Sequence, residues 1–193
     1  MTADAALPQS TTPDQQHWIA LLDAYAQAFP DEIDVVGVFR ELASTDANAA
    51  RRERQAGHLT GSAWLVSADG ERVLLTHHRK LDRWLQLGGH ADGDADLARV
   101  ALREAEEESG LADLEVEPLV FDLDRHRIPA RGDEPEHWHY DVRFVVRARG
   151  SEAFVVGEES HALAWRDVAE IARDDAADVS LRRMARKWLA RRA

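Results

Sequence analysis

Residues 88–111 read GGHADGDADLARVALREAEEESGL, a glycine-rich bend followed by a glutamate-rich segment. The periodicity predicts a helix over residues 97–109, which Gly110 would end. Glu104, Glu107 and Glu108 stand at i, i+3 and i+4 and therefore share one face of that helix. Carboxylates on one face repel one another, and a divalent cation would turn that repulsion into binding. A solvated acidic helix face is the alternative interpretation.

The second half of this stretch, residues 103–111 (REAEEESGL), resembles the second half of the Nudix box, R-E-U-x-E-E-x-G-U, where U is aliphatic or small. Gly89 lies 14 residues before Arg103, where the leading glycine of the box is expected. Residues 89–111 therefore resemble the whole box with one departure, because Ala95 stands in place of its first glutamate. In the family that glutamate supports the helix start more than it holds the essential metal, and Asp94 or Asp96 is expected to replace that support.

The resemblance implies a metal site and the residues that form it. Glu104, Glu107 and Glu108 would be the metal-binding carboxylates, and the carbonyl of Gly88 would complete the shell. Arg103 would orient the glutamates by ion pairing. The implied cofactor is Mg²⁺, with Mn²⁺ as a substitute.

The resemblance also implies a general base, for which the sequence offers several candidates. Glu104 or Glu107 on the helix could take the proton from the attacking water. Some family members use a glutamate of a late loop instead, and here Glu158 and Glu159 are the candidates.

The rest of the chain is consistent with an α/β fold. Strand patterns begin near Leu59, and Asp69-Gly70 is a hairpin signal between two of them. These patterns predict a mixed sheet flanked by helices, and the resemblance implies a Nudix-type α/β/α sandwich with an N-terminal helical extension. We expect residues 1–13 to be disordered, residues 14–57 to form the extension, and residues 58–193 to form the Nudix domain with its C-terminal helix.

Alternating polar residues mark the segment HWHYDVRFVV (137–146). His137, His139 and Asp141 share one face of the expected strand, and His126 has the same parity in the segment before it. If the two segments pair as a hairpin, rows of Asp and His stand side by side. We interpret this face as substrate-binding, together with His90. A second metal site of imidazoles and carboxylates, or a solvent-facing polar sheet, are the alternatives.

The composition excludes several classes of protein. A net charge of -12 argues against general nucleic-acid binding, which depends on neutralising phosphates with Lys and Arg. No apolar run approaches the length of a membrane span, and no secretory signal begins the sequence. The chain has no cysteine, so disulfides are excluded and the cytoplasm is the expected location.

The expected function is that of a Nudix-type pyrophosphohydrolase, an enzyme acting on acid anhydrides in phosphorus-containing compounds. Its implied substrate is a small nucleotide, a nucleoside diphosphate linked to another moiety, and a homodimer is the candidate assembly. A catalytically weak or inactive nucleotide-sensing module is the alternative. Diphosphate isomerase chemistry is excluded because that group uses a catalytic cysteine, which this chain lacks.

Overall fold

The computed structural model describes residues 11–79, 81–157 and 160–192. Its helices are α1 (Pro13–Ala28), the short 3₁₀ turn η1 (Pro30–Glu32), α2 (Ile33–Thr45), α3 (Leu97–Ser109), α4 (Val168–Arg173) and α5 (Val179–Arg192). Its strands are β1 (Gly57–Val66), β2 (Arg72–His78), β3 (Arg83–Leu85), β4 (Leu87–His90), β5 (Leu114–Ile128), β6 (His137–Ala148) and β7 (Ser160–Asp167). Within the described residues, none of the helices combines the length and apolar character needed to cross a bilayer.

The strands form one mixed sheet. Its main path is β3-β2-β1-β6-β5, with β4 paired to β1 and β7 paired to β2. Strands β1 and β6 are parallel, and the other pairs are antiparallel. Every residue of β1 is buried, so this strand is the centre of the fold, and the predicted mixed sheet is confirmed.

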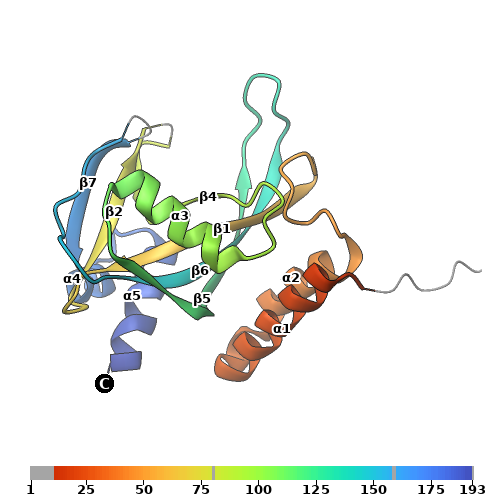
Figure 1. Cartoon of the computed structure of the whole chain (residues 1–193), viewed down its shortest axis with the longest axis horizontal. Coiled ribbons are helices and arrows are strands. Elements are labelled where there is room, and N and C mark those ends of the chain that lie inside the picture. The colour runs from red at the N-terminus through yellow and green to blue at the C-terminus, as the bar shows by residue number, and fades with distance from the viewer. Residues whose placement is uncertain (1–10, 80, 158–159, 193) are drawn as a thin grey trace, which may run out of the picture.

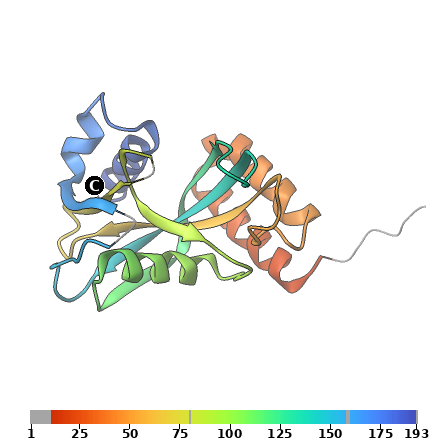
Figure 2. The same cartoon turned by 90° about the horizontal axis from the view of Figure 1, so that it is seen from above.

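Helices cover both faces of the sheet (Figures 1 and 2). Side chains alternate between the two faces along β1. Ala63 and Leu65 belong to a core that also contains residues of α1, α2 and α3, whereas Trp64 and Val66 belong to a core with α4 and α5. The α/β/α sandwich expected from the resemblance is therefore confirmed.

The N-terminal extension is a pair of packed helices. Thr12 caps α1 through a capping box, in which its hydroxyl accepts from the Gln15 amide at 3.3 Å and the Gln15 side chain accepts from the Thr12 amide at 2.9 Å. Of the expected disordered segment 1–13, residues 1–10 lie outside the described residues, and Thr12 and Pro13 instead begin α1. Trp18 donates its indole N–H to the Ala95 carbonyl at 2.9 Å, so the extension contacts the box loop directly.

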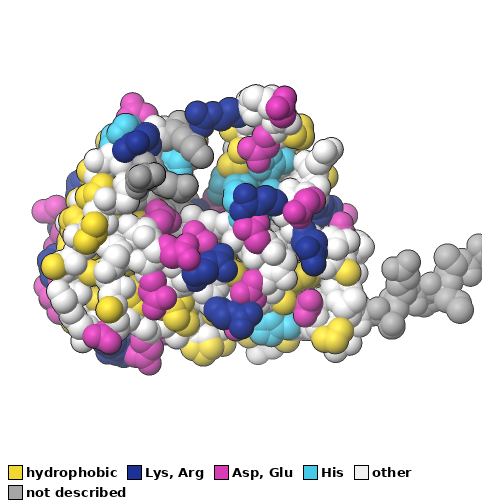
Figure 3. Space-filling model, turned by 45° about the horizontal axis from the view of Figure 1, so that its top comes forward, with side chains coloured by type: hydrophobic (Ala, Val, Ile, Leu, Met, Phe, Trp, Pro, Cys, Tyr) yellow, Lys and Arg dark blue, Asp and Glu magenta, His cyan; other side chains and the backbone are white. Residues whose placement is uncertain are grey.

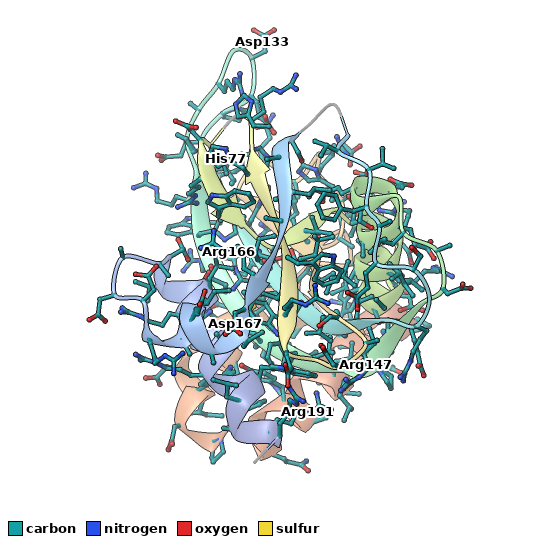
Figure 4. All side chains as sticks on the ribbon, turned by 90° about the vertical axis from the view of Figure 1, so that its left-hand side faces the viewer. His77, Asp133, Arg147, Arg166, Asp167 and Arg191 are labelled. Carbon is teal, nitrogen blue, oxygen red and sulfur yellow. The ribbon has the colours of Figure 1, made fainter. Side chains whose placement is uncertain are left out.

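The C-terminal helix joins distant parts of the chain. Lys187 donates to Asp122 of β5 at 2.7 Å and pairs with Glu32 of η1 at the same distance. Its ammonium also lies 2.5 Å from the Tyr25 hydroxyl of α1. Figure 4 shows Arg147 and Arg191 at this end of the molecule and Asp133, in the β5–β6 loop, at the other.

Candidate active site

Local aspartates fix the start of the glutamate helix. Asp96 is the N-cap of α3 and accepts from the Arg99 amide at 3.0 Å. Asp94 accepts from the Asp96 amide at 3.0 Å and from the Arg99 guanidinium at 2.6 Å, and this hydrogen bond lowers the pKa of Asp94. Together the two aspartates support the helix start beside Ala95, where the box has a glutamate.

Glycines let α3 lie close against the sheet. A Cβ on Gly61 of β1 would lie 2.8 Å from Cγ1 of Val100, closer than real Cβ atoms come. Gly61 pairs with Gly89 of β4, and a Cβ on Gly89 would lie 2.7 Å from the carboxyl carbon of Glu104. The absence of side chains at these positions brings the Glu104 carboxylate against the β4 backbone.

Hydrogen bonds hold two of the three predicted metal-binding carboxylates at this strand. The Gly88 amide donates to Glu108 at 2.8 Å. Arg103 donates to Glu104 at 2.9 Å and to the His90 carbonyl at 3.0 Å, so it links the helix to β4, and the hydrogen bond to Glu104 raises the pKa of Arg103. The Glu104 side chain is 17% exposed, which leaves it accessible to a small ligand.

The other predicted catalytic glutamates are Glu107, Glu158 and Glu159. Glu107 lies on the same turn of α3 and is exposed. Glu158 and Glu159 lie outside the described residues. The donor set at the turn consists of carboxylates beside a backbone strand, which fits a hard cation such as Mg²⁺ because that ion takes oxygen ligands.

The predicted hairpin of polar rows is confirmed by the β5–β6 register. Asp124 pairs with Asp141, and His126 pairs with His139. The ring of His139 lies 5.6 Å from that of His126 and 5.1 Å from that of His90, measured between centroids, and His137 Nε2 lies 3.2 Å from His139 Nε2. The structure thus brings together all four histidines that the sequence marked as substrate-binding. Figure 3 shows histidine side chains gathered in a hollow beside the β5–β6 hairpin.

Asp141, the fifth residue of the predicted substrate-binding set, is enclosed by the fold. It accepts from Thr60 at 3.0 Å and Ser62 at 2.7 Å with one oxygen, and from Gln86 at 3.1 Å and Arg143 at 2.7 Å with the other. It is 2% exposed. Through these hydrogen bonds Asp141 connects β1, β6 and the link between β3 and β4, which is a structural role.

The alternative of a solvent-facing polar sheet is wrong for this part of the strand. Arg143 is 2% exposed and Asp122 is fully buried. Helix α5 covers them, because Arg183 donates to Asp122 at 2.7 Å and to Asp124 at 2.9 Å. Arg143 also pairs with Asp122, at 3.1 Å. The cations around Asp122 keep the pKa of its carboxyl below the usual value despite burial.

Sequence reasoning missed one residue of the histidine group. His58 lies on β1 in register with His139 of β6, and its ring centroid is 5.0 to 5.2 Å from those of His90, His137 and His139. Burial lowers the pKa of His58 to about 4 and that of His139 to about 2, and neighbouring imidazoles add to both shifts. Only the parallel pairing of β1 and β6, which joins residues far apart in the sequence, could have identified His58.

Comparisons with solved structures agree with this fold. The Ap4A hydrolase of C. elegans in a binary complex is similar with a TM-score of 0.54 and 16% identity, over 68% of this chain and 95% of that one. The dihydroneopterin triphosphate pyrophosphohydrolase of E. coli is similar with a TM-score of 0.53 and 17% identity, over 69% of this chain and 95% of that one. A MutT protein from Methanosarcina mazei has a TM-score of 0.51 and 16% identity, over 72% and 97%.

Comparison of the sequence with protein families identifies the family directly. A search of curated proteins found no match. The family model described as "NUDIX domain" matches residues 58–188. These residues cover the sheet, the box helix α3 and most of α5. This match confirms the resemblance and the class of enzyme that it implies, a pyrophosphohydrolase. The chain therefore belongs to the NUDIX domain family.

Proposed function

We propose that this chain is a metal-dependent hydrolase that cleaves the phosphoanhydride bond of a nucleoside diphosphate linked to another moiety. One observation carries the proposal: the carboxylate of Glu104 packs against the bare Cα of Gly89, on the turn of α3 that also carries Glu107 and Glu108. This arrangement concentrates negative charge beside the β4 backbone, where a divalent cation would neutralise it.

The proposed metal ligands are Glu104, Glu107 and Glu108, together with the Gly88 carbonyl, and the proposed ion is Mg²⁺ with Mn²⁺ as a substitute. When bound, the ion would polarise phosphate oxygens and lower the pKa of an attacking water. Arg103 acts as a positioning residue, because it holds Glu104 at 2.9 Å and β4 through the His90 carbonyl at 3.0 Å.

The proposed general base is one of four glutamates. Glu104 and Glu107 lie on the helix, and Glu107 is exposed to solvent, where it can meet a water molecule. Glu158 and Glu159 are the loop candidates carried over from the family. The base would accept the proton released when water attacks the phosphorus.

The proposed substrate-binding residues are His90, His126, His137 and His139. Their rings gather at one end of the sheet, with centroid separations of 5.1 Å (His90 to His139), 5.6 Å (His126 to His139) and 5.1 Å (His137 to His139). Solved relatives by fold include proteins named for Ap4A and for dihydroneopterin triphosphate, which supports a small phosphate-bearing nucleotide. A cytoplasmic location and a homodimer complete the proposal.

A catalytically weak or inactive sensing module is the competing function. The feature that favoured it is Ala95, because the box has a glutamate there. The capping of α3 by Asp96 and the pairing of Asp94 with Arg99 support the helix without that glutamate, which favours the enzyme.

The test is a substrate panel with metal-stripped protein. ADP-ribose, nucleotide sugars, nucleoside triphosphates and dinucleoside polyphosphates are incubated with and without Mg²⁺ or Mn²⁺, and the products are identified. We expect metal-dependent hydrolysis that Glu107→Gln and Glu108→Gln abolish. Glu106→Gln is the matched control, since it makes the same change in charge on an exposed position of the same helix.

The outcomes separate the two functions. Near-wild-type hydrolysis by both Glu107→Gln and Glu108→Gln would exclude the metal assignment. Thermal stabilisation by a nucleotide without any turnover would favour the sensing module instead.

A further inference from the structure

We propose that His58, His90 and His139 form a second metal site, distinct from the glutamate turn, that binds a divalent transition metal of the zinc class. Three strands bring these residues together at one end of the sheet. His58 pairs with His139 between the parallel strands β1 and β6, and His90 ends β4, which pairs with β1 two residues further along, at Thr60. The inference uses none of the three glutamates, but it shares His90 and His139 with the proposed substrate-binding residues, so its test measures metal binding and not hydrolysis.

The spacing of the three rings fits one tetrahedral ion. Their centroids lie 5.1 Å (His58 to His90), 5.0 Å (His58 to His139) and 5.1 Å (His90 to His139) apart. In a tetrahedral site with Zn–N bonds of about 2.0–2.1 Å, the centroids of bound imidazoles lie about 5 Å apart. One nitrogen of each ring lies within 4.8 Å of the others, so small rotations would direct all three at a common centre.

The orientation of the rings excludes a simple stack. The planes of His58 and His90 are inclined by 41°, those of His58 and His139 by 54°, and those of His90 and His139 by 86°. Inclined planes leave one nitrogen of each ring able to face a common centre, which their mutual distances of no more than 4.8 Å permit.

His58 carries an independent sign of a missing partner. It is 2% exposed, and within the described residues its Nε2 is buried and has no hydrogen-bond partner. A buried polar atom left unpaired costs about 1–3 kcal/mol, and native proteins rarely keep one without a reason. A bound metal ion would accept this lone pair.

Two neighbouring histidines, His126 and His137, are held by hydrogen bonds of the kind that orient metal-binding histidines. Zinc-bound histidine usually directs its other ring nitrogen at a carbonyl or carboxylate. His137 Nδ1 lies 2.9 Å from the Pro135 carbonyl, and His126 Nδ1 lies 3.2 Å from Asp124. The Nε2 atoms of His137 and His139 are 3.2 Å apart, close to the separation of about 3.3 Å between two nitrogens on one tetrahedral zinc. His137 thus lies beside His139, one of the three proposed ligands.

The choice of metal follows from the donors. Imidazole nitrogens suit zinc and its neighbours in the transition series, whereas Mg²⁺ prefers carboxylate, carbonyl and water oxygens. The two sites adjoin in sequence, because His90 directly follows Gly89, but their donor atoms select different ions.

The experiment measures zinc binding by the full chain, without a histidine tag and after removal of metals by chelation. Calorimetric titration with Zn²⁺ in excess Mg²⁺ should give one tight site per chain, and Co²⁺ should give the intense visible absorption of a tetrahedral complex. We expect His90→Gln and His139→Gln each to weaken Zn²⁺ binding by at least about 100-fold. Loss of a group that only orients a metal ligand already weakens binding by about 10- to 100-fold, and loss of a ligand should cost more. His17→Gln, on an exposed position of α1, is the matched control and should bind like the wild type.

Two further variants keep the test decisive. Glu107→Gln should bind Zn²⁺ normally even if it abolishes hydrolysis, which separates this inference from the proposed function. His90 is only partly buried, so His90→Gln should keep its fold, which far-UV circular dichroism checks. The inference is overturned if the wild type binds no Zn²⁺, if His90→Gln and His139→Gln bind like the wild type, or if Glu107→Gln removes the tight site.

Discussion

Replacing Gly89 by Ala should disable catalysis without unfolding the protein. Gly89 does not have a positive φ, so alanine introduces no backbone strain there. The added Cβ would lie 2.7 Å from the carboxyl carbon of Glu104, whereas ordinary van der Waals contact begins at 3.4 Å. Oε2 of the same carboxylate would lie closer still. The carboxylate must therefore retreat by at least about 0.7 Å, which exceeds the tolerance of about 0.2 Å for metal–ligand distances.

The expected magnitude follows from this displacement. A misplacement of about 1 Å at a catalytic centre can cost about 100-fold in rate, and we expect a loss of that order in kcat for Gly89→Ala. The stability should change by less than about 1 kcal/mol, because the displaced atoms end a flexible side chain. The assay is metal-dependent hydrolysis of the best substrate of the panel, with urea unfolding measured in parallel.

Gly37→Ala is the matched control. Gly37 lies on an exposed position of α2 with no atom within 4 Å of an added Cβ, so alanine should leave turnover unchanged and stabilise the helix by about 0.5–1 kcal/mol. Turnover by Gly89→Ala within about threefold of the wild type, where the 100-fold loss is expected, would refute the assigned role of Glu104. A loss of several kcal/mol in stability would show that Gly89 acts through the fold instead.

Three further predictions concern stability. Asp122→Asn should cost about 3–5 kcal/mol in urea unfolding at pH 7, because it removes the fully buried anion that Arg143 and Lys187 share and leaves them only their pairs with Asp124, Asp141 and Glu32; a loss below about 1 kcal/mol would contradict this. Metal-free protein should lose stability as pH falls below about 6.5, where the unfolded chain protonates histidines that the native state keeps neutral, by about 1.4 kcal/mol per pH unit for each of His58 and His139. His139→Gln should reduce that slope, and an unchanged slope would show that His139 does not contribute to the pH dependence of stability. Trp18→Phe should cost about 1–3 kcal/mol through loss of its hydrogen bond to the box loop, and equal unfolding midpoints for variant and wild type would show that this contact is dispensable.

The sequence predicted the elements whose signals are local. The box helix was expected over residues 97–109 and occupies Leu97–Ser109, because Asp96 and Gly110 mark its ends. The pairing of the two polar rows was predicted from side-chain parity and is confirmed by the β5–β6 register. The family could be identified because the spacing of the glycines, Arg103 and the glutamates is itself local.

Features that depend on long-range pairing could not be predicted. His58 joins the other imidazoles only because β1 runs parallel to β6, and no periodic signal in the chain specifies that neighbour. The burial of Asp141 and Arg143 likewise depends on α5 and the β3–β4 link, which lie far away in the sequence. The roles assigned to Glu104, Glu107, Glu108 and the loop glutamates stay predictions.

The ammonium of Lys187 contacts three elements that are distant from one another in the chain. It contacts an α1 tyrosine, an η1 carboxylate and a buried β5 aspartate, so detaching the helical extension would remove the Tyr25 and Glu32 contacts of this ammonium. The first helices and the last should consequently melt together with the sheet in one cooperative transition. In energetic terms the folding unit should therefore extend beyond the family match at residues 58–188 and include α1, η1 and α2.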